Sequence, residues 1–431
     1  MNERSAKTLY SIFDFEWLMV KKLNIAFVCD SVNLQDSGSL ISTWHFSVAL
    51  AKKGHKVVLI STGEKNSFSV EEGVRIYRIG SWATPGTEGK WRMPIFPSKR
   101  YMKDVFTKEK IDLVHFTVPT PLCLRAANLA KKMGLPVVGH SHTQPENLTM
   151  YYRFDSELFK KYFYKFLLWF YSRAGVVVCP TKFSESKLKK YSKGVNTVVI
   201  SNGVDLNRFK KVEITDEFIK KYDIKKGKKR ILFVGRIWPD KNAAVLVKAM
   251  YLILKKNKNV YLDLVGAVSD QKYVDEVRAL IEKYNLHDRV HLWGKVSDSD
   301  VVSFYNVCDV FCLPSYVELE GMVVLEAMGL EKPIVISDSV ESASRFFVDG
   351  NGYNFHTADE VDLSKKMLKI LGDDDLRKKM GEKSFENVKR LEMGECVKQL
   401  EDVYLDEIKK NKDARKGGGK EVKKKNSENI K

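Results

Sequence analysis

The 431-residue chain lacks several features that mark well-known classes of protein. It contains no apolar run that approaches the roughly 20 residues a helix needs to cross a bilayer. Its first residues include Asp14 and Glu16, so we expect no secretory signal peptide there. It shows no zinc-ligand spacing, helix-turn-helix signature or RNA-binding signature, so a nucleic-acid partner is disfavoured.

Cysteine is scarce, and its placement is that of a reduced, cytosolic protein. Most of the six cysteines lie in apolar, strand-like runs such as the one ending at Cys179. Cys308 and Cys312 have no cysteine or histidine partner nearby, so we expect no metal site there. A Gly-x-Gly-x-x-Gly pattern is also missing after the first expected strand, which disfavours a dinucleotide-dependent dehydrogenase.

Positive charge, in contrast, is abundant. The chain has 73 Lys and Arg against 55 Asp and Glu, a net charge of +18. Such a balance suits an anionic membrane surface or a phosphorylated substrate. Residues 409–431 are strongly basic and contain the run Gly417–Gly419 with almost no apolar side chains. We expect this tail to be disordered.

Short β-rich runs alternate with helical stretches along most of the chain. One set extends from residue 23 to about 201, and a second begins at Arg230 and includes the apolar run Val310–Leu313. This alternation is typical of parallel sheets covered on both faces by helices. It predicts two Rossmann-like α/β domains with a cleft between them, where ligands lie outside the carboxyl ends of the strands.

The stretch Ser315–Met328 is the most informative in the chain. Glu318 and Glu326 stand eight residues apart, with Gly321 between them, and they follow an expected buried strand. Free N–H groups at a helix start attract anions, and ionised carboxylates accept strong hydrogen bonds from hydroxyl groups. The stretch therefore suits a sugar phosphate, although an amphipathic helix with surface acids would share the Glu spacing.

This stretch resembles the Glu-x7-Glu motif of the retaining, family-4-type (group 1) glycosyltransferases, which have the GT-B fold. The flanking pattern, from Pro314 to Pro333, agrees as well. The resemblance covers roughly residues 23–404 and implies transfer of a sugar from a nucleotide diphosphate, with retention of configuration. The expected organisation is an N-terminal extension (1–18), an N-terminal acceptor domain (19–205) completed by a crossover helix (about 385–408), a nucleotide-sugar domain (206–384) and the basic tail (409–431).

A second motif, Gly235–Asn242, follows another expected strand. Arg236 and Lys241 place two cations five residues apart, which matches two phosphates of a nucleotide-sugar. The stretch resembles the family's Gly-Arg-Leu-x-x-Glu-Lys, with Asp240 in place of the glutamate. A polar turn with surface cations is the alternative. If the resemblance holds, Arg236 and Lys241 neutralise the leaving diphosphate, and no metal or other cofactor is needed.

Weaker signals complete the expected site. Gly38 stands in a loop that resembles the family's Gly-Gly loop, with Ser37 in place of the first glycine. His142 matches a histidine that faces the donor sugar, whereas His140 is expected only to cap its strand. The resemblance further implies that Glu326 holds the ribose and Glu318 the sugar. The remaining donor-binding residues that we expect are Gly235, Gly321, Met322, Val323, Lys295 and Val296, the last two beside the base.

Two features concern metal and membrane. Asp298 and Asp300 form an Asp-x-Asp, but we expect them to cap the following helix. Residues 151–173 are aromatic and basic, and a helix there would place Phe159, Tyr162, Phe163, Phe166 and Phe170 on one face, with Tyr164, Leu168 and Tyr171 on the other. Such a helix either lies on an anionic membrane or packs in a domain core.

The sequence therefore predicts a retaining hexosyltransferase that uses a UDP- or GDP-sugar. We expect Glu318, His142, Arg236 and Lys241 to act in catalysis. The expected acceptor is a membrane lipid such as diacylglycerol, met by a peripheral protein at the cytoplasmic membrane face. A soluble or polysaccharide acceptor is the alternative, and a basic membrane-binding protein with a degenerate sugar site is the non-enzyme alternative. The sequence does not determine the oligomeric state.

Overall fold

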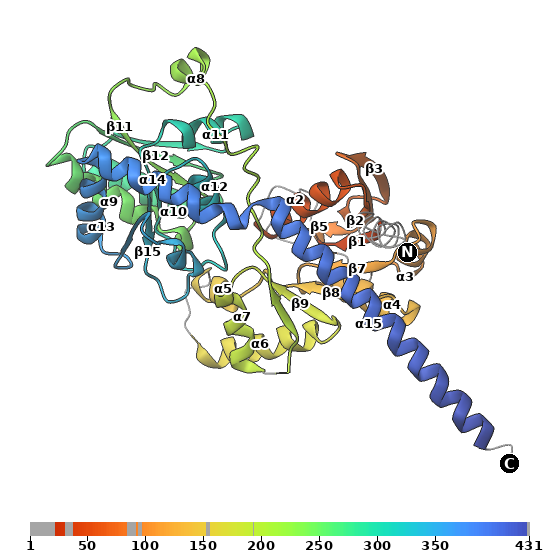
Figure 1. The fold of residues 1–431 in the computed structure, drawn as a ribbon. Coiled ribbons are helices and arrows are strands. Elements are labelled where there is room, and N and C mark those ends of the chain that lie inside the picture. Colours follow the sequence, from red (N-terminus) through yellow and green to blue (C-terminus); the bar gives the residue numbers. More distant parts are fainter. Residues whose placement is uncertain are drawn as a thin grey trace, which may run out of the picture. The chain divides into compact units, whose positions relative to one another are not determined.

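The computed structural model shows two compact units built from α/β elements (Figure 1). One unit contains the described residues up to Val138 and those from Tyr404 onward, and the other contains Gly139–Val403. The division falls inside one strand, β8 (Val137–His140). The structure describes residues 22–30, 38–83, 92–93, 97–151, 156–192 and 194–428. The predicted extension 1–18 and Ser37 lie outside these ranges.

The first unit contains a mostly parallel sheet. Its strand order is β8–β7–β1–β2–β4–β3, in which only β3 is antiparallel to its neighbour β4 in the recorded pairings. Residues 25–28 of β1 are fully buried, as expected of a central parallel strand covered on both faces. The elements are β1 (Asn24–Val28), α2 (Gly38–Lys52), β2 (Lys56–Gly63), β3 (Ser67–Glu71), β4 (Val74–Gly80), β5 (Trp82–Ala83), β6 (Arg92–Met93), α3 (Lys99–Lys108), β7 (Leu113–Phe116) and α4 (Pro121–Met133).

The second unit begins with three strands in the order β10–β9–β8. Their apolar residues are short β-branched runs, and the amphipathic helices between them supply the covering layer. Capping side chains set the helix starts, because Ser156 accepts from Phe159 N and Thr181 accepts from Ser184 N. The elements are α5 (Pro145–Tyr151), α6 (Glu157–Tyr171), β9 (Val176–Cys179), α7 (Lys182–Tyr191) and β10 (Thr197–Val199).

The same unit contains a six-stranded sheet in the order β13–β12–β11–β14–β15–β16, whose pairings are all parallel. Its strands are β11 (Lys229–Val234), β12 (Val260–Val265), β13 (Val290–Gly294), β14 (Val310–Leu313), β15 (Ile334–Ser337) and β16 (Gly352–Phe355). The chain moves outward from β11 to β13 and then returns past β11 to β14. The topological switch point therefore lies between β11 and β14, where ligands of such folds bind.

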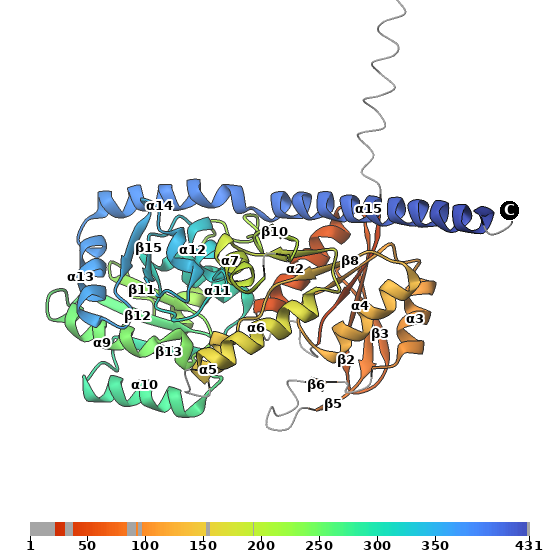
Figure 2. The same cartoon turned by 90° about the horizontal axis from the view of Figure 1, so that it is seen from below.

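Helices cover both faces of this sheet (Figure 2). Right-handed crossovers place the helices of the two halves on opposite faces, with α9, α10 and α13 on one face and α11, α12 and α14 on the other. The apolar side chains of strands and helices form one continuous core. The helices are α8 (Asp216–Lys221), α9 (Ala243–Leu254), α10 (Gln271–Lys283), α11 (Asp298–Val307), α12 (Met322–Gly329), α13 (Glu360–Leu371) and α14 (Asp374–Val388), and the 3-10 turns are η1 (Pro239–Lys241), η2 (Ala343–Phe347) and η3 (Lys389–Leu391).

The last helix, α15, extends from Met393 to Glu428. It starts eight residues later than the helix predicted at about 385–408, because α14 and η3 occupy the preceding residues. The prediction of disorder from residue 409 is wrong for the backbone up to Glu428, which is helical. The segment is rich in lysine, a good helix former, and continues an already nucleated helix across Gly417–Gly419.

The six cysteines are all free and buried, as their apolar surroundings predicted. No helix in the described part of the chain is both long and apolar enough to cross a membrane.

Candidate functional site

The Glu318–Glu326 stretch joins β14 to α12, as its sequence predicted. Gly321 precedes the first helical residue with φ 90° and ψ 64°, in the left-handed region. A Cβ atom at this position would lie 2.3 Å from Ser344 Oγ. Both the backbone angle and the close approach require glycine, so Gly321 fixes where the free N–H groups of Met322 and Val323 begin.

Glu318 and Lys241 meet at the switch point of the sheet. Lys241 closes η1, directly after β11, and Glu318 lies after β14, the neighbouring strand. Lys241 Nζ is 2.6 Å from Glu318 Oε1 and 3.5 Å from Asp240 Oδ2. Burial alone would lower the pKa of Lys241, but the two carboxylates raise it above its ordinary value. Lys241 therefore carries its full positive charge near neutral pH.

Asp240, which replaces the family's glutamate, is buried beside this pair. Its backbone carbonyl accepts a hydrogen bond from Tyr316 N at 2.8 Å, which ties η1 to the start of the Glu318 loop. The Nδ2 atom of Asn147, on α5, lies 3.5 Å from Asp240 Oδ2. The helix α5 therefore lies beside the Lys241 turn. Sequence analysis missed Asn147, because nothing in its local pattern differs from a surface asparagine.

The predicted Gly235 and Arg236 follow β11, and the predicted Lys295 and Val296 follow β13. Gly266 lets the ends of β11 and β12 approach closely, because a Cβ on it would lie 1.9 Å from Gly235 O. Gly266 N also donates to Gly294 O at 2.9 Å, which brings the end of β13 alongside. Arg236 and Lys295 are exposed, so both cations remain accessible to an anion at this edge.

Glu326 lies on α12, half-buried, and its partner is Tyr305 of α11. Tyr305 Oη lies 2.8 Å from Glu326 Oε2 and 3.1 Å from Val323 O. Burial raises the pKa of Glu326, while the Tyr305 hydroxyl and the charge of Arg208 oppose that rise. Sequence analysis missed Tyr305. It is fully buried, and only the adjacency of α11 and α12 brings its hydroxyl to Glu326.

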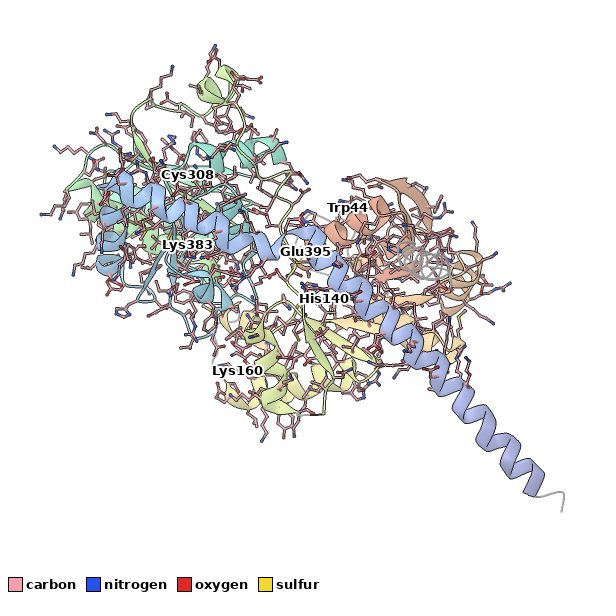
Figure 3. The ribbon with its side chains drawn as sticks, viewed as in Figure 1. Trp44, His140, Lys160, Cys308, Lys383 and Glu395 are labelled. Atoms are coloured by element: carbon pink, nitrogen blue, oxygen red, sulfur yellow. The ribbon has the colours of Figure 1, made fainter. Side chains whose placement is uncertain are left out.

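His142 follows β8, and its ring stacks on that of His140, with 4.0 Å between centroids (His140 is labelled in Figure 3). Burial lowers the pKa of His142 to about 3, so its imidazole is neutral near physiological pH. The Nε2 atom of His142 is buried and has no hydrogen-bond partner among the described residues. A neutral ring nitrogen in this position can form a hydrogen bond with a ligand hydroxyl, as donor or as acceptor according to its tautomer.

Gly38 and the Asp298–Asp300 pair each have their own surroundings. Gly38 is the first residue of α2, in the other unit, and is exposed. Ser297, and not either aspartate, caps α11 by accepting from Asp300 N. Asp298 pairs with Arg208 at 3.2 Å, and Asp300 pairs with Lys221 at 2.9 Å. The described residues contain no group of three or more potential metal ligands.

Comparison with known families agrees with this geometry. The model described as "Glycosyl transferases group 1" matches residues 214–387, and "Glycosyltransferase Family 4" matches residues 37–208. Lys241 and Glu318 both lie inside the first of these matches. The chain belongs to the group 1 glycosyltransferases. The predicted glycosyltransferase activity and the α/β fold with two parallel sheets are thereby confirmed.

Named relatives of this glycosyltransferase are distant in sequence. The alpha-monoglucosyldiacylglycerol synthase of Acholeplasma laidlawii is 26% identical over 388 residues, which span 87% of this chain and 95% of that protein. The synthase of the same name from Streptococcus pneumoniae is 26% identical over 73% of this chain and 70% of its own length. A Staphylococcus aureus capsular polysaccharide glycosyltransferase is 32% identical, but over only 40% of this chain and 44% of that protein.

Solved structures show the same fold. A glycosyltransferase from Rickettsia africae superposes with a TM-score of 0.72 and 19% identity, over 90% of this chain and 99% of that one. Sucrose-phosphate synthase from Thermosynechococcus elongatus gives a TM-score of 0.70 at 20% identity, over 89% and 98% of the two chains. At this identity the likeness establishes the GT-B architecture.

Proposed function

We propose that the protein transfers a hexose from a UDP- or GDP-sugar to a membrane lipid such as diacylglycerol, with retention of configuration. One observation carries the donor part of this proposal. The half-buried, charged Lys241 lies at the switch point of the sheet, against Glu318 in the loop that leads to the N-terminus of α12. A permanent cation and free N–H groups at this position suit a leaving diphosphate.

Each residue of the site then has a distinct part. Lys241 and Arg236 stabilise the negative charge that develops on the leaving diphosphate, in place of a metal ion. Glu326, oriented by Tyr305, accepts hydrogen bonds from the ribose hydroxyls. Glu318 and the neutral His142 bind the sugar hydroxyls. Lys241 Nζ, now 2.6 Å from Glu318 Oε1, would be shared between that carboxylate and the diphosphate when donor is bound.

The lipid acceptor is supported by two independent observations. The first is the name of the A. laidlawii relative, an alpha-monoglucosyldiacylglycerol synthase that aligns over 95% of its length. The second is the surface of α6, on which Leu158, Tyr162, Phe166 and Trp169 are 41–63% exposed. Their spacing of four, four and three residues places them along one side of the helix, which we call the α6 stripe.

Cations border the α6 stripe. Lys165 lies 5.5 Å from the ring centroid of Tyr162, and the Arg173 guanidinium lies 3.8 Å from that of Trp169. Lys161 is exposed, and Lys160 pairs with Glu157 at 2.8 Å (Lys160 is labelled in Figure 3). Exposed aromatic side chains flanked by cations suit the headgroup region of an anionic membrane. This arrangement supports peripheral binding at the cytoplasmic membrane face.

The structure corrects the predicted faces of this helix. Phe170, expected on one face with Phe159, Tyr162, Phe163 and Phe166, is buried together with Tyr164, Leu167 and Tyr171. Trp169 and Leu158, which the prediction did not place on that face, are exposed. The helical spacing was right, but the direction of the unit core was not available from the sequence alone. The helix therefore has one side in the core and the other in solvent, and the solvent side is the one proposed to meet the membrane.

A polysaccharide acceptor is the second candidate. The capsular polysaccharide relative, which is 32% identical over its matched segment, favours it. A transfer assay separates the candidates: purified protein is given labelled UDP- and GDP-hexoses with diacylglycerol in anionic vesicles or with soluble oligosaccharides. We expect label in the lipid fraction with one donor. Label in the oligosaccharide alone would favour the second candidate, and no transfer to any acceptor would contradict both.

A further inference from the structure

Glu320 lies inside the Glu318–Glu326 stretch, yet its side chain points into the protein. It is only 3% exposed, whereas Glu318 and Glu326 are half-buried. A buried carboxyl group requires hydrogen-bond partners, and Glu320 has two. Ser201 Oγ donates to Oε1 at 2.5 Å, and Asn202 N donates to Oε2 at 3.1 Å. Ser201 Oγ in turn accepts from Gly203 N at 3.0 Å, which directs its own proton toward Glu320.

The partners of Glu320, Ser201 and Asn202, lie where two segments of the chain are hydrogen-bonded to each other. Residues 201–204, which we call the crossover turn, pair with the segment that precedes α15. Val204 N donates to Leu391 O at 3.0 Å, and Met393 N donates to Val204 O at 2.9 Å. Gly203 packs so closely that a Cβ on it would lie 3.2 Å from Met393 Cα. Cys396, on α15, lies near enough to this turn for Glu320 and Ser201 to influence its thiol.

The backbone of the same loop is anchored on its other sides. Thr181 Oγ1 donates to Leu319 O at 2.8 Å, and Ser344 Oγ donates to Glu320 O at 2.8 Å. Ala343 N donates to Glu318 O at 2.8 Å. These bonds hold three consecutive carbonyl groups, and Glu320 supplies the side-chain attachment to the crossover turn. Loss of this attachment would leave the loop between Glu318 and Gly321 held only by its backbone bonds and should make it more mobile.

We infer that Glu320 is a positioning residue that fastens the sugar-binding loop to the crossover turn and so holds Glu318 and the N-terminus of α12 in place for the donor. This inference rests on the proposed function for its kinetic consequence, but its structural part does not. Glu320 acts through Ser201 and Asn202 and has no contact with substrate in this role.

The attachment of Glu320 to Ser201 and Asn202 requires hydrogen-bonding groups at the Glu320 side chain and does not require negative charge. In Glu320→Gln, the amide oxygen can accept from Asn202 N and the amide N–H can donate to Ser201 Oγ, as a neutral carboxyl group would. In Glu320→Leu, the volume is similar but both partners lose their acceptor. Ser201→Ala removes one of the two bonds and leaves the loop sequence unchanged. Glu382, an exposed glutamate on α14, provides the matched control variants Glu382→Gln and Glu382→Leu.

The test combines backbone hydrogen exchange with donor kinetics. In Glu320→Leu we expect faster exchange in peptides that cover residues 315–325, unchanged exchange in β15, and a donor KM raised about tenfold with the acceptor KM unchanged. Glu320→Gln should restore both quantities to within about threefold of wild type. Ser201→Ala should shift both in the same direction by less, and combining it with Glu320→Leu should add little.

Two outcomes would overturn the inference. One is wild-type exchange at residues 315–325 in both Glu320→Leu and Ser201→Ala. The other is equal loss in Glu320→Gln and Glu320→Leu, which would assign the effect to charge and not to the attachment. If wild-type protein transfers no sugar at all, the proposed function fails, while the exchange comparison still decides whether Glu320 holds the loop.

Discussion

In the candidate donor site the ammonium group of Lys241 lies 2.6 Å from Glu318 Oε1, and despite burial the neighbouring carboxylates raise its pKa, so it keeps its positive charge near neutral pH. Lys241→Met removes this charge and keeps much of the aliphatic stem. We expect turnover to fall about 10²–10³-fold, since one preorganised charge at a leaving group has an effect of this order. Steady-state kinetics checks this, with the exposed Lys255→Met as control. Turnover within threefold of wild type would remove Lys241 from the leaving-group site.

Glu326 and Tyr305 are hydrogen-bonded to each other, and their contributions to donor binding can be measured separately. Glu326→Ala should weaken binding of the donor nucleotide roughly 10–100-fold, because it removes a hydrogen-bond acceptor from the proposed ribose position. Tyr305→Phe removes only the hydroxyl that orients the carboxylate and should weaken binding less, in the same direction. Calorimetric titration with donor measures both. Unchanged affinity in Glu326→Ala would refute the ribose role.

Glu320 gives folding stability a defined pH dependence. Burial raises the pKa of Glu320 from 4.5 to about 7, while Ser201 and Asn202 oppose the rise. Between these values the folded protein retains a proton that the unfolded chain releases. The stabilisation is therefore present in acid and is lost as pH rises through 7. Cys396, which lies near Glu320, stays protonated throughout this range, since its own pKa is raised to about 12.

The comparison of wild type with Glu320→Gln isolates this contribution. From pH 5 to pH 8, the free energy of unfolding of wild type should fall relative to that of the variant by about 1–3 kcal/mol. Denaturant unfolding at several pH values measures the difference, and effects of other titrating groups cancel in it. A difference that does not change with pH would mean that Glu320 does not titrate in this interval.

Among the structural elements, those with local signals were predictable and those set by packing were not. The strand–loop–helix around Gly321 follows from its spacing and from one glycine. The meeting of Lys241 and Glu318, 77 residues apart in sequence, depends on β11 and β14 being neighbours in the sheet. Tyr305, Asn147 and Glu320 gave no local signal, because each acquires its partner only through tertiary packing.

The helix α6 shows the same limit and leads to a prediction of its own. Its spacing identified an amphipathic helix, but the core side was known only from the structure. Lys161→Glu with Lys165→Glu reverses two exposed charges beside the α6 stripe, and the double variant should lose most vesicle binding, since each cation contributes about 1 kcal/mol near an anionic surface. Flotation with anionic vesicles at low salt measures this.

A matched control addresses net charge. Lys378→Glu with Lys379→Glu makes the same change on exposed residues of α14, in the same unit. We expect it to retain binding close to wild type. Equal loss in both double variants would assign binding to overall charge, and retained binding in the α6 variant would show that the stripe is not the docking surface.

At the scale of the whole molecule, the proposed mechanism needs no metal ion. If the side chains of Lys241 and Arg236 neutralise the leaving diphosphate as proposed, transfer should proceed at an unchanged rate in EDTA. The measurement is transfer rate after chelation and after re-addition of Mg²⁺. Complete loss of transfer in EDTA that Mg²⁺ restores would contradict metal independence. It would make Asp298 and Asp300 candidate metal ligands.

The most direct test of the account is the product that purified protein forms from labelled UDP- and GDP-hexoses with diacylglycerol in anionic vesicles. We predict a glycosylated lipid whose new bond has the anomeric configuration of the donor, as read by nuclear magnetic resonance of the product. Formation should fall about 10²–10³-fold in Lys241→Met and stay near wild type in Lys255→Met. A product of inverted configuration, or lipid product formed equally well by Lys241→Met, would contradict the account.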